Sequence, residues 1–385
     1  MPTIYDVAVI GAGAMGSAAT YFLSKTTNKI LVLDKYAPPH SFGSSHGQSR
    51  IIREAYFESP LYVPLVQQAY QLWEDLERES GKKLFLRTGG LMIGNNDQKV
   101  FRGASISAFQ HGITYEFLDQ DAIKKRFPVF KPPPGTVALF EKNAGILFPE
   151  ECIRTFLQLA KKQEVHFHFN EEAFSIKSRN DKVEITTGRG KYEAGKVIVC
   201  TGAWIPMLFP ELQLPLEVKR QLLFWFNCTS GNAEKFSPEN FPIYIWEHEK
   251  NKIFYGFPDL GDGVKIAIHH QGQLTTADTI NRRIGDEEIN AMSQIIHRYF
   301  DAQFTFNYSE VCMYTNTPDE NFIIDYYPAN RNIIIVSACS GHGFKFSSAI
   351  GKILCDMALE KKLSFDVSVF NIARLIGKEA SPDLV

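Results

Sequence analysis

The chain has 385 residues, which is enough for two or three domains with well-formed cores. Its 41 basic and 43 acidic side chains give a formal net charge of −2, and it has no run of Lys and Arg of the kind that binds nucleic acid. No apolar run approaches the ~20 residues of a membrane span, and an apolar strand that begins at Asp6 leaves no room for a signal peptide, so we expect a soluble, cytoplasmic protein.

The first predicted element is a short buried strand, residues 6–10, that runs directly into a glycine turn and a helix. The turn has the pattern GxGxxG, whose glycines allow a tight turn, let the backbone approach a pyrophosphate and let the helix pack close to the strand. These glycines are Gly11, Gly13 and Gly16. A second apolar strand, residues 29–33, ends in Asp34, where a carboxylate would accept hydrogen bonds from a ribose. The sequence therefore predicts a βαβ dinucleotide site, with a glycine turn of some other α/β protein as the alternative.

A long loop of turn-forming residues, 38–50, follows, and long ordered loops frequently carry function. Apolar residues at positions 65, 69, 72 and 76 then predict a helix that ends at Gly81. From about Leu84 short strands around glycines indicate a different domain. A helix over 149–161 is followed by an alternating strand, 165–169.

The remaining chain first becomes rich in aromatics and short strands, and then returns to the order of strand, glycine turn and helix that is typical of a nucleotide-binding domain. The apolar run 196–204 is typical of a buried strand, and residues 216–314 are rich in aromatics and short strands that would suit a large antiparallel sheet, with one helix over 287–300. A strand over 332–336, a glycine turn and a helix over 346–359 then repeat the order of the first domain.

The predicted fold class is therefore α/β: a doubly wound, Rossmann-like nucleotide-binding domain interleaved with an α+β substrate domain on a large, mostly antiparallel sheet. The nucleotide-binding domain is assigned 1–84, 147–215 and 316–385, and the substrate domain 85–146 and 216–315.

Several ionisable residues could carry chemistry, although each has an ordinary explanation. Arg50 and Arg53 would normally be solvated surface charges, and Lys265 and His269 share one face of an alternating strand that could equally face water. Cys312, one of six cysteines without CxxC spacing that we expect to be free thiols, would by composition alone be a buried small hydrophobe. The histidines at 166 and 168 lack a nearby third ligand, so no metal site is predicted.

Four separated blocks, residues 11–16, 44–53, 312–320 and 340–346, resemble the monomeric sarcosine oxidase family, which includes N-methyltryptophan oxidase and pipecolate oxidase. The resemblance runs nearly end to end. It implies a monomeric flavoprotein with FAD held covalently through a cysteine sulfur, which oxidises a secondary amino acid to the imine and reduces O2 to H2O2. The implied substrates are sarcosine, another N-methyl amino acid, or a compound of the L-pipecolate or L-proline type.

The resemblance also implies roles for individual residues. Cys312 matches the flavin-attachment cysteine, Arg53 and Lys345 would hold the substrate carboxylate with Tyr56 nearby, and Lys265 would lie on the oxygen-reacting side of the flavin. Arg50, His269, Tyr314 and Tyr255 would complete the catalytic group. The implied FAD contacts are Gly11, Gly13, Met15, Gly16, Asp34, Lys35, Ser44, His46, Arg50, Cys312, Gly341, Gly343, Phe344 and Lys345.

Two other functions remain open from the sequence. A flavin dehydrogenase would pass its electrons to a carrier instead of O2, and a catalytically idle flavoprotein would serve as an assembly subunit. The several ionisable groups expected around one cofactor argue against the idle protein, because an idle site has no reason to keep them.

Overall fold

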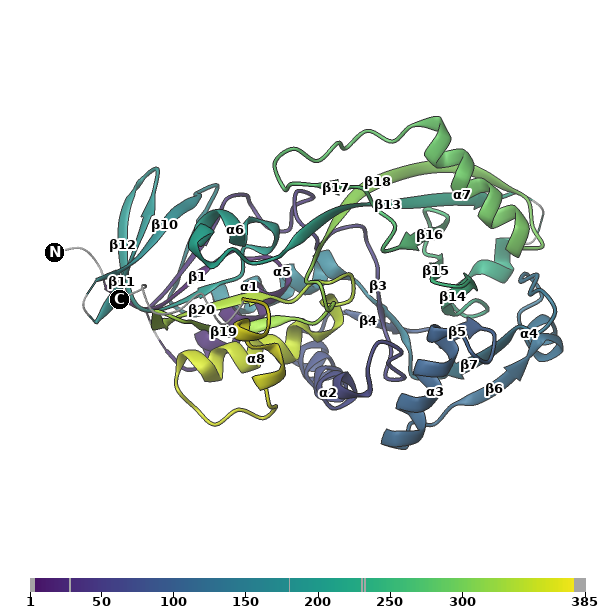
Figure 1. Ribbon diagram of the computed structural model, residues 1–385, viewed down its shortest axis with the longest axis horizontal. Coiled ribbons are helices and arrows are strands. Elements are labelled where there is room, and N and C mark those ends of the chain that lie inside the picture. Colours follow the sequence, from purple (N-terminus) through teal and green to yellow (C-terminus); the bar gives the residue numbers. More distant parts are fainter. Residues whose placement is uncertain (1–3, 28, 180, 230, 232, 377–385) are drawn as a thin grey trace.

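Two large sheets carry the fold, and the chain crosses between them several times (Figure 1). The computed structural model describes residues 4–376 apart from residues 28, 180, 230 and 232, so the outer ends of the predicted domain segments, at 1 and 385, lie outside the described residues. In Figure 1 the eight-stranded sheet lies toward the left of the view, and the nine-stranded sheet lies toward the right.

The centre of the eight-stranded sheet is parallel, and two of its inner strands, residues 4–10 and 30–34, are mostly buried and apolar, as expected where both faces are covered. Its parallel strands are, in spatial order, β20 (Asn330–Ser337), β12 (Gly190–Val199), β1 (Ile4–Ile10), β2 (Ile30–Asp34) and β9 (Val165–Phe169). Antiparallel strands complete it: β10 (Ala173–Arg179) and β11 (Lys182–Thr187) beside β12, and β19 (Ile323–Tyr327) beside β20. The predicted doubly wound sheet is confirmed, although the β10–β11 hairpin was not foreseen.

Four long helices belong to this half of the molecule: α1 (Ala14–Ser24), α2 (Val63–Ser80), α5 (Pro149–Lys161) and α8 (Ser347–Ala358). Helix α2 ends at Gly81 as predicted, in the left-handed conformation with φ +68°, and the Gly81 N–H donates to the Glu77 carbonyl at 2.9 Å. A short helix, α6 (Ile205–Leu208), follows β12. Among the described residues, no helix combines the length and apolar character needed to cross a bilayer.

The nine-stranded sheet is mostly antiparallel, as predicted; β5 and β14 form its parallel pair. Its main path runs β17 (Leu274–Thr275), β13 (Glu217–Cys228), β16 (Val264–His269), β15 (Lys252–Asp259), β14 (Ile243–Glu249), β5 (Gly90–Gly94), β7 (Val137–Glu141) and β6 (Glu116–Asp119). Strand β18 (Phe304–Asn316) pairs with β13 along its length.

An aromatic core lies between this sheet and helix α7 (Asp286–Tyr299), which matches the predicted helix over 287–300. The rings of Trp246, Phe254 and Tyr299 pack with centroids 4.9–5.5 Å apart. Helices α3 (Lys99–His111) and α4 (Gln120–Arg126) follow the first strands of the sheet and were not among the predicted elements.

A three-stranded sheet joins the two halves: β3 (Arg50–Ile52), β8 (Gly145–Leu147) and β4 (Phe85–Arg87). It draws strands from segments assigned to different predicted domains, so backbone hydrogen bonds cross the boundary that we place near residue 84. Because β3 begins at Arg50, this small sheet also sets the position of the loop that precedes it.

Candidate functional site

A cavity of about 440 Å³ extends from the carboxyl ends of β1 and β2 to the nine-stranded sheet. In open parallel sheets ligands bind at this edge, and the volume is typical of a ligand pocket. The cavity wall includes the residues that begin α1, the loop over 38–45, the end of β18 and the turn before α8. Segments far apart in the sequence therefore converge on one elongated space.

The glycine turn has the geometry that a dinucleotide requires. Gly11 has φ +90°, and a Cβ there would lie 2.6 Å from the Cys200 carbonyl oxygen. A Cβ on Gly16 would lie 1.8 Å from the Gly11 carbonyl oxygen, so this glycine lets α1 pack on the turn and does not itself line the cavity. The N-cap of α1 is Gly13, which leaves the helix N-terminus open to an anion, and Met15 also lines the cavity.

Asp34 and Lys35 follow β2 at the cavity wall. The Asp34 carboxylate is buried and accepts the Ala12 backbone N–H at 2.6 Å, which ties the end of β2 to the glycine turn. Lys35 pairs with Glu172 at 3.1 Å and Asp278 at 3.3 Å at the outer part of the site.

The Cys312 thiol is buried at the cavity wall and lies among cationic side chains. Its sulfur is 3.7 Å from Nη2 of Arg50 and 3.7 Å from the Ser44 carbonyl oxygen. Burial alone would raise its pKa, but His46 and Arg50 lower the pKa of Cys312 to about 7. Arg50 and Ser44 line the cavity, whereas His46 lies behind the wall.

Two further cations, Arg53 and Lys345, line the cavity and are almost fully buried. Arg53 Nη2 donates to Glu58 Oε2 at 2.6 Å, while Arg53 Nε is buried without a hydrogen-bond partner among the described residues. Burial and Arg53 lower the pKa of Lys345 to about 7, although Glu58 opposes them, and the Lys345 ammonium donates to the His342 carbonyl at 2.5 Å. Burial would raise the pKa of Glu58, but Arg53, His342 and Lys345 lower it to about 2. Glu58 is thus the one carboxylate in the described part of the chain that offsets the positive charge of Arg53 and Lys345.

Three polar rings, Tyr255, Tyr314 and His269, form one wall of the cavity. The two tyrosine hydroxyls are 3.4 Å apart, and His269 Nδ1 is 3.4 Å from the Tyr314 hydroxyl. Burial and His270 hold the pKa of His269 well below its usual range, so the imidazole is neutral near pH 7. Gly341 packs against this wall, since a Cβ there would lie 2.7 Å from the Tyr314 ring. Gly343 and Phe344 also line the cavity.

Besides Gly16 and His46, two more predicted site residues, Tyr56 and Lys265, lie outside the cavity wall. Tyr56 is buried, and its hydroxyl lies 2.5 Å from His342 Nδ1, so it supports the turn that carries Lys345. Lys265 is 2% exposed, which excludes the solvated alternative, and its ammonium donates to the Gly47 carbonyl at 2.5 Å and the Ser49 carbonyl at 3.1 Å. Burial and Arg50 hold the pKa of Lys265 well below its usual range.

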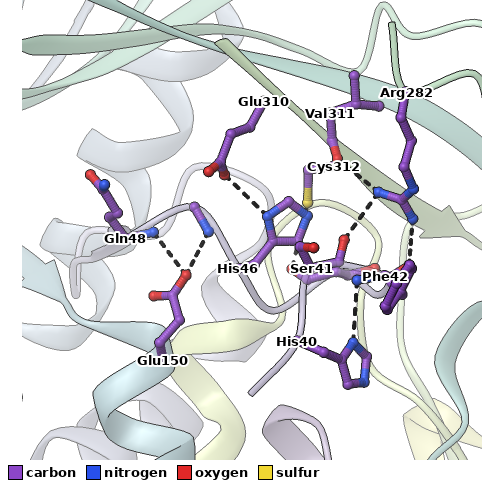
Figure 2. Close-up of polar contacts among 12 residues, drawn as sticks. His40, Ser41, Phe42, His46, Gln48, Glu150, Arg282, Glu310, Val311 and Cys312 are labelled. Carbon is purple, nitrogen blue, oxygen red and sulfur yellow. Dashed lines mark hydrogen bonds and ion pairs between the residues drawn. The ribbon is translucent and has the colours of Figure 1, made fainter. Parts of the chain in front are cut away.

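Two carboxylates of the site were not identified from the sequence: Glu58 and Glu310. Glu310 lies two residues before Cys312 on β18, and Figure 2 shows its carboxylate directed to His46 beside the sulfur. Strand alternation could have placed Glu310 on the face of Cys312. Glu58 had no comparable signal, because it follows Arg53 in an irregular segment.

The residues at the two ends of the cavity fit FAD. The open glycine cradle and free end of α1 suit a pyrophosphate, and the buried Nε of Arg53 and Nε2 of His46, which lack partners among the described residues, lie at the end where Cys312 could bond to a ring. No group of three or more His, Cys, Asp or Glu side chains suited to a metal ion occurs within the part of the chain described.

A nucleotide-binding sheet whose cavity continues into an enclosure of buried cations and aromatic rings defines a flavin-dependent oxidoreductase. In agreement, residues 6–357 match the family model described as FAD dependent oxidoreductase. The chain is 41% identical to monomeric sarcosine oxidase of Streptomyces avermitilis over 99% of this chain and 100% of that protein. It is 35% identical to N-methyl-L-tryptophan oxidase of Escherichia coli O7:K1, over 96% and 99%. The chain therefore belongs to the monomeric sarcosine oxidase family within the FAD-dependent oxidoreductases.

Solved structures show the same fold at lower sequence identity. L-proline dehydrogenase from P. horikoshii has a TM-score of 0.84 with 19% identity, covering 97% of this chain and 98% of that one. NikD, an amino acid oxidase essential for nikkomycin biosynthesis, has a TM-score of 0.83 with 20% identity, covering 96% and 97%.

Proposed function

We propose that this protein oxidises the C–N bond of a secondary amino acid to the imine, with FAD as the immediate electron acceptor and O2 as the final one, yielding H2O2. The observation that carries the proposal is the pair of buried cations, Arg53 and Lys345, at the wall of the cavity that contains Cys312. A buried cation pair with a single carboxylate partner has capacity for one more anion, and an amino acid carboxylate supplies it.

The flavin ring supplies the two-electron chemistry when it is bound, and the protein binds, orients and tunes it. Gly11, Gly13 and the end of α1 would hold the pyrophosphate, and Asp34 the ribose. Cys312 would hold the ring covalently, because a thiol with a pKa of about 7 is substantially thiolate near neutral pH. Gly341, Gly343 and Phe344 would face the ring from the turn before α8.

The substrate carboxylate would pair with Arg53 and Lys345. Arg53 already donates to Glu58, so the incoming carboxylate either shares the guanidinium, through the free Nε, or displaces Glu58. In either arrangement the planar fork of Arg53 fixes the direction of the amino acid. The amine would then lie toward the wall formed by Tyr255, Tyr314 and His269.

The neutral state of His269 suits this chemistry. An amine must be uncharged to lose electrons, and a protonated imidazole beside it would oppose the positive charge that develops on the nitrogen. A neutral ring and two tyrosine hydroxyls supply polar contacts without that penalty. Apolar side chains, Ile245, Phe257 and Leu223, complete the wall and would receive the substituents of the substrate.

Lys265 is proposed to assist electron transfer to O2. Its ammonium lies directly behind the loop that carries Arg50, so its charge would act on the ring through that loop. We also propose that the protein acts as a cytoplasmic monomer, as inferred from the sequence.

The proposal is tested by a peroxide assay on the purified protein with sarcosine, L-pipecolate, L-proline and N-methyl-L-tryptophan. At least one should give H2O2. The variant Arg53→Met should lose one charge-assisted hydrogen bond worth roughly 1.5–3 kcal/mol and so bind that substrate about 10- to 100-fold more weakly. Flavin reduction by substrate without peroxide formation would identify a dehydrogenase, and parental affinity in Arg53→Met would refute the carboxylate site.

A further inference from the structure

Glu310 is a half-buried carboxylate that the reaction proposed above does not use. It lies on β18 two residues before Cys312, and because successive side chains of a strand alternate, the two side chains share a face. Glu310 Oε2 lies 3.2 Å from Nδ1 of His46. A carboxylate that acted directly on the reactive thiol would raise the thiol's pKa. A cationic group between the two would reverse that effect, because it would stabilise the thiolate.

That intervening group is the imidazole of His46. Figure 2 shows the ring between the Glu310 carboxylate and the Cys312 sulfur, with the second ring nitrogen turned toward the sulfur. The side chain is 6% exposed, and Nε2 has no hydrogen-bond partner within the chain segments that the structure describes. A buried N–H that lacks an acceptor is costly, and a thiolate at Cys312 would offset that cost.

Other charged groups also face this assembly. Arg50 approaches the sulfur from the start of β3. Lys265 lies behind the loop of Gly47 and Ser49 and interacts electrostatically with both Glu310 and Cys312. Glu150 of α5 accepts the backbone N–H groups of residues 47 and 48 at 2.7 and 3.1 Å, which holds the segment carrying His46. Burial disfavours the imidazolium, but Cys312 and Glu310 together raise the pKa of His46 to about 9.

We propose that Glu310 is a positioning residue for covalent flavin attachment: it holds His46 as an imidazolium against Cys312, so that the sulfur is a thiolate when FAD arrives. The proposal rests on the covalent link of the proposed function. In the attachment, the S–H bond and one C–H bond of a ring methyl group break and an S–C bond forms. The step yields two protons and two electrons; the electrons pass through the flavin to O2, which also takes up two protons and becomes H2O2.

The test uses the full chain prepared free of flavin, with the variant Glu310→Gln, which keeps the shape of the side chain and removes its charge. Asp262→Asn is the matched control, since Asp262 is exposed, contacts Gln48 of the same loop at 3.1 Å and leaves His46 untouched. Two quantities are measured from pH 6 to 9: the rate of Cys312 alkylation by iodoacetamide, corrected with Cys312→Ala, and the rate at which added FAD becomes acid-precipitable in air.

We expect Glu310→Gln to move the alkylation midpoint upward by about one pH unit or more, which lowers the thiolate fraction at pH 7 from about one half to about one tenth. Attachment at pH 7 should slow about fivefold or more, and the difference should close at pH 9, where the thiol ionises unaided. Glu310→Asp, which keeps the charge, should restore part of the shift. Asp262→Asn should match the parent protein.

An unchanged alkylation midpoint in Glu310→Gln overturns the proposal, and so does a slower attachment that persists equally at pH 9, because that is the behaviour of a purely structural residue. Failure of the covalent link and failure of the role of Glu310 give different results. If the parent protein takes up no acid-stable flavin, the covalent link itself fails, whereas the alkylation profile still decides whether Glu310 controls the thiol.

Discussion

At the scale of single residues, buried cationic side chains explain why the site attracts anions. Arg50, Arg53, Lys265 and Lys345 are all held by oxygen acceptors, and burying a cation without such partners would cost several kcal/mol. The acceptors are mostly backbone carbonyls, which carry no negative charge to cancel that of a protonated side chain. The site therefore keeps an attraction for anions, whether a substrate carboxylate, a thiolate or reduced oxygen.

Lys265 allows a prediction about the oxygen half-reaction. The first electron transferred to O2 creates superoxide, and a nearby preorganised charge stabilises such a developing anion by several kcal/mol. In Lys265→Met, we expect anaerobic reduction by substrate at a moderately altered rate and reoxidation in air slowed by about 10²- to 10³-fold. Lys265→Arg should keep part of the rate. Stopped-flow measurement of both half-reactions checks this, and parental reoxidation in the methionine variant would leave Lys265 a structural role only.

Lys345 allows a prediction about pH. Its pKa is lowered to about 7 by burial and Arg53, so the side chain is charged below that pH and loses its proton as the pH rises through it. A bound carboxylate favours the charged form and raises the pKa in the complex. The affinity for a simple carboxylate such as acetate should therefore fall above pH 7, by at most about tenfold per pH unit. Flavin absorbance titrations should show this decline in the parent protein and a flatter profile in Lys345→Arg, which stays charged; equal slopes would contradict the assignment.

At the scale of elements, close helix packing supports the nucleotide site. Helix α8, which follows the turn carrying Lys345, packs on α1, which follows the glycine turn. Their contact contains Gly351, where a Cβ would lie 2.5 Å from Ala18 Cβ. The small residues of both helices thus set the distance between the two turns that line the cavity.

Gly351→Ala is therefore expected to destabilise the protein even though alanine favours helices by about 1 kcal/mol. Overpacking a core contact costs typically about 1–3 kcal/mol. The steric cost should therefore exceed the gain in helix propensity, and the melting temperature should fall. Gly188→Ala is the control, since a Cβ at Gly188 would have no heavy atom within 4 Å apart from those of its chain neighbours. Thermal unfolding followed by circular dichroism decides; an equal or higher melting temperature in Gly351→Ala would show that the helices can move apart freely.

At the scale of the whole molecule, the cavity is the place where the two large sheets meet. Its wall takes residues from the first βα unit, from β18 and from the turn before α8, so a bound flavin would contact both halves of the chain at once. Folding stability and cofactor binding should then be coupled.

Cys312→Ala makes that coupling measurable, because the cofactor becomes free to dissociate. Its melting temperature should rise with added FAD, corresponding to about 2.7 kcal/mol at a concentration 100 times the Kd. The parent protein, loaded covalently, should melt at a temperature that does not respond to added FAD. Differential scanning fluorimetry across FAD concentrations checks both; a response of equal size in the acid-washed parent would mean that its flavin is not covalently held.

The sequence by itself determined the local elements and the fold class. The strand, glycine turn and helix at residues 6–24, the stop at Gly81 and the antiparallel character of 216–314 all follow from short-range patterns, which depend on neighbouring residues only. The candidate site residues came from motif blocks and strand alternation, and their roles remain predictions.

The tertiary structure alone decided which charges meet. Glu58 beside Arg53, Glu310 beside His46, and Lys265 behind the loop of Gly47 are pairings of side chains brought together by sheet register and loop closure, and periodicity carries no information about such distances. The three-stranded sheet that crosses the predicted domain boundary arises in the same way, because its strands lie up to about a hundred residues apart in the chain and no short-range pattern shows which of them pair.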